Sequence, residues 1–119
     1  MPTLERFTPR ELGPKDWGVE LLIAELPFAT GKVLQMRAGA SGPLQYHERK
    51  HEAFYLFSGD ADVTYDAGDG LVTRRMQAGE TYLVPPGAVH RVSAVTACVL
   101  FEISNPVFDD RVNVEAQYT

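Results

Sequence analysis

Hydrophobic and polar residues alternate along several short stretches of the chain, and no run of ten or more residues keeps a helical periodicity. The alternation is clear at 33–36, where Val33 and Gln35 share one face of an extended segment and Leu34 and Met36 share the other. Glycine- and proline-containing turns separate these stretches. The expected strands lie at 17–25, 31–38, 52–58, 60–66, 71–76, 79–84 and 96–103. The pattern indicates an all-β sandwich or barrel.

Composition narrows the function classes without naming one. The chain has 119 residues, the size of one domain, and a net charge of −5 with scattered basic residues, which argues against a nucleic-acid partner. No apolar stretch reaches membrane-spanning length, and the first residues lack the apolar run of a secretory signal, so we expect no membrane association. The single Cys98 permits no internal disulfide, which favours a cytoplasmic location.

Residues 45–52 combine an amide, two imidazoles and two carboxylates within eight positions. In an extended segment Gln45 and His47 point to the same side. Glu52 opens the following strand on the face that also carries Phe54 and Leu56. A carboxylate on an apolar face is costly unless a positive group lies against it, and a metal ion is the simplest candidate.

A second stretch, 79–90, predicts a strand, a tight turn at Pro85–Gly87 and a further strand that carries His90. The turn returns His90 to the depth of the first strands. The expected ligands of one divalent metal ion per chain (zinc, manganese, iron or nickel) are therefore Gln45, His47, Glu52 and His90.

These two stretches resemble the paired motifs of the cupin superfamily. The first, at 39–59, runs Gly39, five residues, Gln45, one, His47, four, Glu52, six, Gly59, with Gln45 in place of a histidine. The second, at 79–94, runs Gly79, five, Pro85, one, Gly87, two, His90, three, Ala94, with Ala94 in place of an asparagine. The resemblance implies a double-stranded β-helix (a jelly-roll barrel), a metal centre and a homodimer. The apolar residues Leu21 to Ile23 would suit an intersubunit sheet.

More narrowly, segments 14–20, 31–34, 44–52 and 109–118 resemble the cupin domain of type II mannose-6-phosphate isomerases. That family has an arginine where this chain has Asn113, and Gly-Arg where it has Thr119; these departures weigh against a sugar-phosphate substrate. We expect a single cupin domain over 1–119, with an N-terminal arm at 1–16 and a C-terminal tail at 107–119 that could pair with that arm.

The leading hypothesis is a small-molecule enzyme of the sugar or sugar-phosphate isomerase type. An iron-dependent dioxygenase and a non-catalytic module that binds or senses a small ligand are the alternatives. Candidate substrate-binding residues are Lys32, Tyr46 and Arg91, whereas His51 should point away from the site because it neighbours Glu52. The sequence does not identify a catalytic acid or base.

Overall fold

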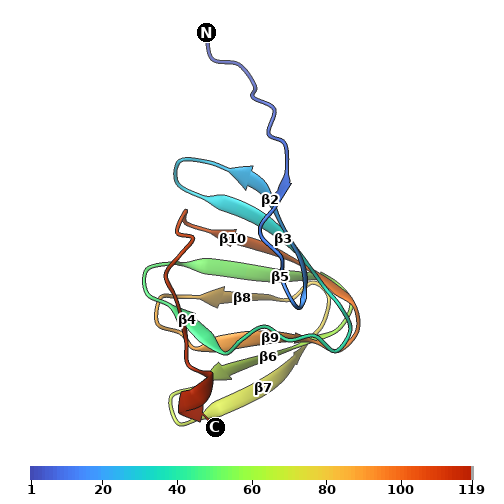
Figure 1. Ribbon diagram of the computed structural model, residues 1–119, viewed down its shortest axis with the longest axis vertical. Helices are drawn as coiled ribbons and strands as arrows, with labels where there is room; N and C mark the ends of the chain where they lie inside the picture. Colours follow the sequence, from blue (N-terminus) through green and yellow to red (C-terminus); the bar gives the residue numbers. More distant parts are fainter. Residues whose placement is uncertain (119) are drawn as a thin grey trace.

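The computed structural model describes residues 1–118, which form two antiparallel sheets (Figure 1). The six-stranded sheet has the order β1 (Arg10–Glu11), β2 (Gly18–Glu25), β3 (Thr30–Met36), β10 (Cys98–Ser104), β5 (Glu52–Ser58) and β8 (Thr81–Val84). The five-stranded sheet has the order β11 (Arg111–Asn113), β4 (Gln45–His47), β9 (His90–Ala94), β6 (Ala61–Asp66) and β7 (Leu71–Met76). A single 3₁₀ turn, η1 (Glu115–Tyr118), follows β11. The predicted all-β double-stranded β-helix is confirmed.

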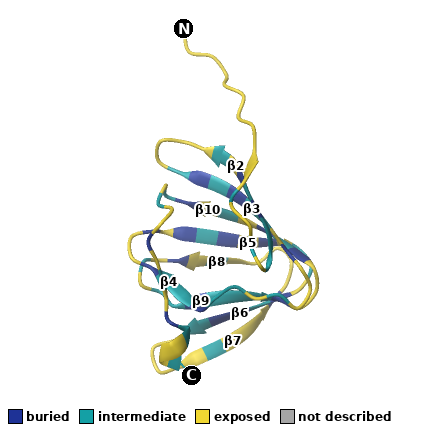
Figure 2. Cartoon of the chain, viewed as in Figure 1, coloured by how far each residue is buried: buried dark blue, intermediate teal, exposed yellow. Residues whose placement is uncertain are grey.

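The core lies between the two sheets because each strand alternates its side chains between the inside and the surface. In β5, Phe54 and Leu56 are buried while Tyr55 and Phe57 are exposed. Figure 2 shows buried residues along β3, β10 and β5, whereas most of β7 is exposed. Leu56 and Leu100 are 0% exposed, and burying a side chain of this size contributes about 1.5–3 kcal/mol to stability.

One glycine of the first motif is required by its surroundings. Gly59 directly follows β5 and has a φ of 85°, a left-handed conformation that other residues adopt only at a cost. A Cβ atom at this position would lie 2.4 Å from the carbonyl oxygen of Ala97, which belongs to the loop before β10. The glycine therefore allows the chain to turn from β5 into β6 against a neighbouring backbone.

The C-terminal tail was expected to be able to pair with the N-terminal arm, but the two segments lie on different sheets. Residues 1–9 are exposed and extend away from the sheets, and Arg10–Glu11 pair with β2 (Figure 1). The C-terminal segment instead adds β11 to the edge of the other sheet, beside β4.

The segment Leu21 to Ile23, which was expected to suit an intersubunit sheet, offers little apolar surface. Leu22 is fully buried, and of the three residues only Ile23, which points to the opposite face, is exposed, at 40%. Among the described residues no helix is long and apolar enough to cross a membrane.

Candidate metal centre and its pocket

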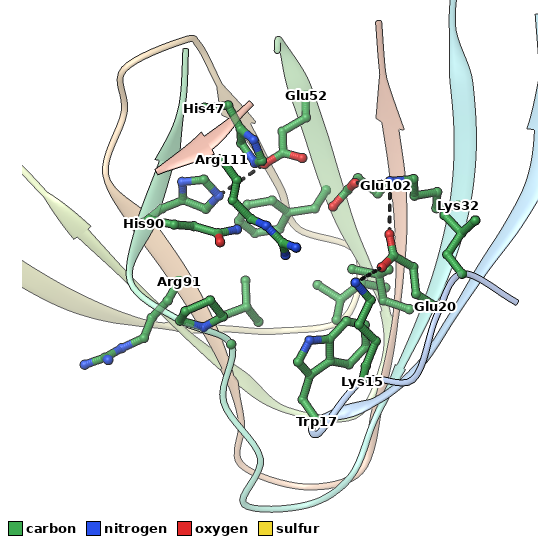
Figure 3. Close-up of a pocket in the computed structure, with 18 of the residues that line it drawn as sticks. Lys15, Trp17, Glu20, Lys32, His47, Glu52, His90, Arg91, Glu102 and Arg111 are labelled. Carbon is green, nitrogen blue, oxygen red and sulfur yellow. Dashed lines mark hydrogen bonds and ion pairs between the residues drawn. The ribbon is translucent and has the colours of Figure 1, made fainter. Parts of the chain in front are cut away.

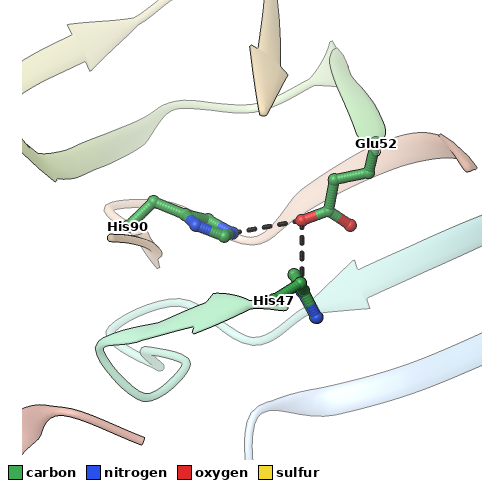
Figure 4. Close-up of side chains that lie close together, drawn as sticks. All are labelled: His47, Glu52 and His90. Carbon is green, nitrogen blue, oxygen red and sulfur yellow. Dashed lines mark hydrogen bonds and ion pairs between the residues drawn. The ribbon is translucent and has the colours of Figure 1, made fainter. Parts of the chain in front are cut away.

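Three buried side chains from both sheets converge on one point: His47, Glu52 and His90 (Figure 4). His47 ends β4 and His90 begins β9 in the five-stranded sheet, whereas Glu52 begins β5 in the six-stranded sheet. Their candidate ligand atoms all lie within 4.8 Å of one another. Glu52 Oε1 is 3.1 Å from His90 Nε2 and 3.4 Å from His47 Nε2.

Each imidazole is oriented by a hydrogen bond at its other nitrogen. His47 Nδ1 lies 3.1 Å from Asp110 Oδ1, and His90 Nδ1 lies 2.9 Å from the carbonyl oxygen of Ala88. A carbonyl oxygen only accepts, so Nδ1 of His90 donates, and the same holds for His47 beside an ionised Asp110. Both Nε2 atoms are thereby directed at the point occupied by Glu52 Oε1, as in a histidine prepared to bind a metal.

Asp110 is a functional candidate that the sequence did not reveal. Besides His47, its carboxylate accepts hydrogen bonds from the backbone N–H groups of Arg49 at 2.6 Å and Lys50 at 2.8 Å. Desolvation opposes ionisation of Asp110, but these hydrogen bonds outweigh it and the pKa of the carboxyl lies below its usual range. The C-terminal segment therefore fixes the orientation of His47, a candidate metal ligand.

We predict that Asp110→Asn weakens metal binding about 10–100-fold, the usual effect of removing the partner that orients a ligating histidine. Competition with a chromophoric chelator would measure the dissociation constant. Asp109→Asn is the matched control, because Asp109 lines the pocket but makes no such contact with His47. Equal affinities for Asp110→Asn and the unmodified protein would contradict the positioning role.

The charge state of Glu52 suits a ligand for a cation. Desolvation opposes its ionisation, yet hydrogen bonds with His47 and His90 dominate, and the pKa of Glu52 falls well below its usual range. Lys50, itself buried, adds an ammonium 3.7 Å from Glu52 Oε2. Burial lowers the pKa of His90, but its hydrogen bond with Glu52 more than offsets this and the pKa is raised. A metal ion would therefore displace protons from this centre as it binds.

The side chain of Gln45 bears most directly on whether this centre fits a metal ion. Its Oε1 atom is buried and has no hydrogen-bond partner within residues 1–118. Buried polar atoms are almost always paired, so an orphaned oxygen needs an explanation. Gln45 lines the same pocket as the His47, Glu52 and His90 cluster and points to the same side of β4 as His47. Two imidazole nitrogens with carboxylate and amide oxygens fit a divalent metal ion.

The centre opens into a pocket of about 340 Å³ between the two sheets (Figure 3). Its wall on the six-stranded sheet carries a row of buried charges that link β2, β3 and β10. Lys32 Nζ lies 3.0 Å from Glu20 and 3.9 Å from Glu102, and Glu20 also pairs with Lys15 at 3.2 Å. Lys50 Nζ lies 3.8 Å from Glu102 and 3.7 Å from Glu52, and so connects this row to the candidate metal centre.

Glu102 is the second functional candidate that sequence reasoning missed. Burial and the nearby negative charge of Glu52 raise the pKa of Glu102 to about 7. It occupies an inward position of β10, beside Lys32 on β3 and Phe54 on β5. A signal was present in the sequence, because Glu102 is a lone carboxylate between Phe101 and Ile103 in an otherwise apolar strand. It lies two positions from Leu100, which is buried, and therefore on the same face of the strand.

The three predicted substrate-binding residues differ in how they lie relative to the pocket. Lys32 lines the pocket and is buried. Arg91 also contributes to the wall, but its guanidinium is held 3.1 Å from Glu115 and turns away from the centre in Figure 3. Tyr46 does not line the pocket, because it alternates with Gln45 and His47 along β4 and faces the other side. His51 is exposed, as expected.

A family model for the cupin domain matches residues 32–104, which is more than half of the chain. The chain belongs to the cupin family. No curated protein matches this cupin in sequence. The more specific resemblance to type II mannose-6-phosphate isomerases stays a prediction.

Solved structures support the cupin fold. KdgF from Halomonas sp. is 19% identical with a TM-score of 0.74, covering 84% of this chain and 90% of that protein. The capsular polysaccharide assembling protein CapF from Staphylococcus aureus is 19% identical with a TM-score of 0.80, covering 92% of this chain but only 32% of CapF. Oxalate decarboxylase from Bacillus subtilis is 24% identical with a TM-score of 0.73, covering 88% of this chain and 30% of that protein.

Proposed function

We propose that this cupin holds one divalent metal ion through Gln45, His47, Glu52 and His90, and isomerises a small sugar in the adjoining pocket. The proposal rests on one observation above all. A carboxyl group that is only 13% exposed and whose pKa is raised to about 7, that of Glu102, lines the same pocket as the candidate metal ligands. Sugar isomerisation needs such a pair: a cation near the substrate oxygens and a group that both accepts and returns a proton.

The pocket's own residues account for the proton transfers. Glu102 in its ionised form would remove the proton from C2 of an open-chain aldose, and the electrons of that bond would form the C1–C2 double bond of an enediolate. Glu102, now protonated, would return the proton to C1 while the hydroxyl proton on O2 passes to O1, giving the ketose. A bound metal ion would polarise the substrate oxygens and stabilise the negative charge.

The surroundings of Glu102 suit this role. Its side chain is only 13% exposed, and a pKa close to neutral lets the carboxyl group exist in both protonation states near pH 7. Lys32 and Lys50 lie 3.9 Å and 3.8 Å from it, so they favour its ionised form as ion pairs but are too distant to hydrogen-bond its oxygens. The manganese centres described for the oxalate decarboxylase of Bacillus subtilis lend support to metal chemistry on this fold.

The deciding experiment is a substrate screen with metal-loaded protein in deuterated water, followed by NMR. Conversion of an aldose to its ketose, with deuterium incorporated at the exchanged carbon, would support the proposal, and chelator-treated protein is the control. Oxygen consumption without isomerisation would identify the dioxygenase alternative. Binding of sugars with neither reaction would favour the non-catalytic module.

We also propose a homodimer that forms through the outer face of the six-stranded sheet. The neighbouring strands β5, β8 and β10 expose Phe57 at 56%, Leu83 at 78% and Ile103 at 63% on this face. Exposed apolar side chains in such a group favour association. Light scattering should give twice the chain mass, and a Phe57→Glu variant should be monomeric; a monomeric unmodified protein at every concentration would contradict the dimer.

A cytoplasmic location stays a prediction, which imaging of a tagged chain would test.

A further inference from the structure

Arg111 places a guanidinium group in the pocket beside the candidate metal centre. In the pairing of β11 with β4, Arg111 lies directly opposite His47. Directly opposed residues of antiparallel strands project from the same face of a sheet, with Cβ atoms about 4.5–5.5 Å apart. Since His47 faces the pocket, Arg111 does so too, and Figure 3 shows its guanidinium directed into the space between the two walls.

Within the described part of the chain, Arg111 differs from the other basic residues of the pocket in having no acidic partner. Four of these residues are engaged with carboxylates: Lys15 and Lys32 with Glu20, Lys50 with Glu52, and Arg91 with Glu115. No ion pair involves Arg111 within residues 1–118. It is exposed and lines the pocket, so a ligand in the pocket can reach it.

The other charges around the pocket are close to balanced. Five basic side chains line it (Lys15, Lys32, Lys50, Arg91 and Arg111) against four acidic ones (Glu20, Glu52, Glu102 and Asp109), and Arg91 is compensated by Glu115 outside this lining. The guanidinium of Arg111 is therefore the positive charge of the pocket that remains available to attract a negatively charged ligand.

We propose that Arg111 binds an anionic group of the substrate, a carboxylate or a phosphate, so that the pocket selects acidic over neutral sugars. This inference rests on the proposed function, because it assigns the substrate class of the same pocket. The planar guanidinium presents two parallel N–H donors that match the two oxygens of either group. The fixed position of Arg111 opposite His47 would hold the rest of the ligand against the metal centre and Glu102.

Calorimetric titration of the zinc-loaded protein with small probes tests the inference without requiring turnover. Glycolate carries a carboxylate, glycolamide is its uncharged counterpart, and inorganic phosphate tests the other anion. We expect glycolate or phosphate to bind the unmodified protein at least about tenfold more tightly than Arg111→Gln, since a charged hydrogen-bonding partner is lost. Glycolamide should bind both proteins equally weakly, and Arg111→Lys should be intermediate.

Any binding of the probes to zinc itself is common to all variants, so the difference between variants isolates Arg111. Arg37→Gln is the matched control, because Arg37 is exposed and does not line the pocket. Zinc content is measured for each variant to verify an intact centre. The comparison of glycolate with phosphate decides which anion the pocket prefers.

Equal anion affinity in Arg111→Gln and the unmodified protein, or no anion binding by the unmodified protein, would overturn the inference. Failure of the proposed function would look different. Arg111-dependent anion binding without isomerisation of any sugar would leave the anion site standing and reject the isomerase. Isomerisation of neutral sugars without Arg111-dependent anion binding would do the reverse.

Discussion

His90→Ala should lose metal almost completely, whereas the unmodified protein should carry about one divalent ion per chain. The variant removes an imidazole whose Nε2 lies 3.1 Å from Glu52 Oε1 at the convergence point of the two sheets. Loss of a ligand should weaken binding by about 100-fold or more, since even loss of a ligand's supporting partner costs 10–100-fold. Elemental mass spectrometry on protein purified without an affinity tag would measure the metal content.

His51→Ala is the matched control for this experiment. It makes the same substitution at His51, an exposed histidine that neighbours Glu52 in sequence but faces away from the centre. The metal found in the unmodified protein would also direct the substrate screen, with zinc or manganese pointing to isomerisation and iron to oxygen chemistry. Retention of metal by His90→Ala, or absence of metal from both proteins after reconstitution, would reject the assigned centre.

Glu102→Gln should lower the rate of sugar isomerisation by about 10²–10⁴-fold, the usual contribution of a positioned acid–base group. The amide keeps the size and polarity of the side chain but neither accepts nor returns a proton. Because burial and the charge of Glu52 raise the pKa of Glu102 to about 7, its ionised fraction grows as the pH rises through 7. The rate of the unmodified protein should therefore rise across this interval, and the residual rate of Glu102→Gln should not.

The pH profile separates proton transfer from a merely structural role for Glu102. Glu102→Asp, which keeps a carboxyl group, should recover part of the rate and the rise near neutral pH. Glu25→Gln is the control at an exposed position of β2 outside the pocket. Unchanged turnover in Glu102→Gln with normal metal content would remove Glu102 from the mechanism.

Much of the fold was predictable because it follows from local rules. Alternation in strands, glycine and proline turns and the spacing of the two motifs are all visible over short stretches of chain. The same alternation predicted that Gln45 and His47 point the same way, and the structure brings His47, Glu52 and His90 together. It also explains why Tyr46, a candidate substrate-binding residue between those two ligand candidates, does not line the pocket.

The remaining parts of the candidate site depend on contacts between distant segments. Asp110 reaches His47 across 63 positions of sequence, and no spacing rule links the two. Glu102 and Lys32 look like ordinary strand residues until the pairing of β10 with β3 places them side by side on the buried face. Arg111 acquires its direction only because β11 docks on β4 rather than on the N-terminal arm.

The docking of β11 has a consequence for the order in which the molecule matures. The four candidate ligands lie at 45–90, but the carboxylate that orients His47 belongs to Asp110 and arrives with the last strand. Contacts this distant in sequence form late in folding, because a long loop must first be closed. The centre would therefore be completed only when the segment that carries Asp110 docks beside β4, after the strands that hold the candidate ligands have formed. Metal uptake would then report that this docking has taken place.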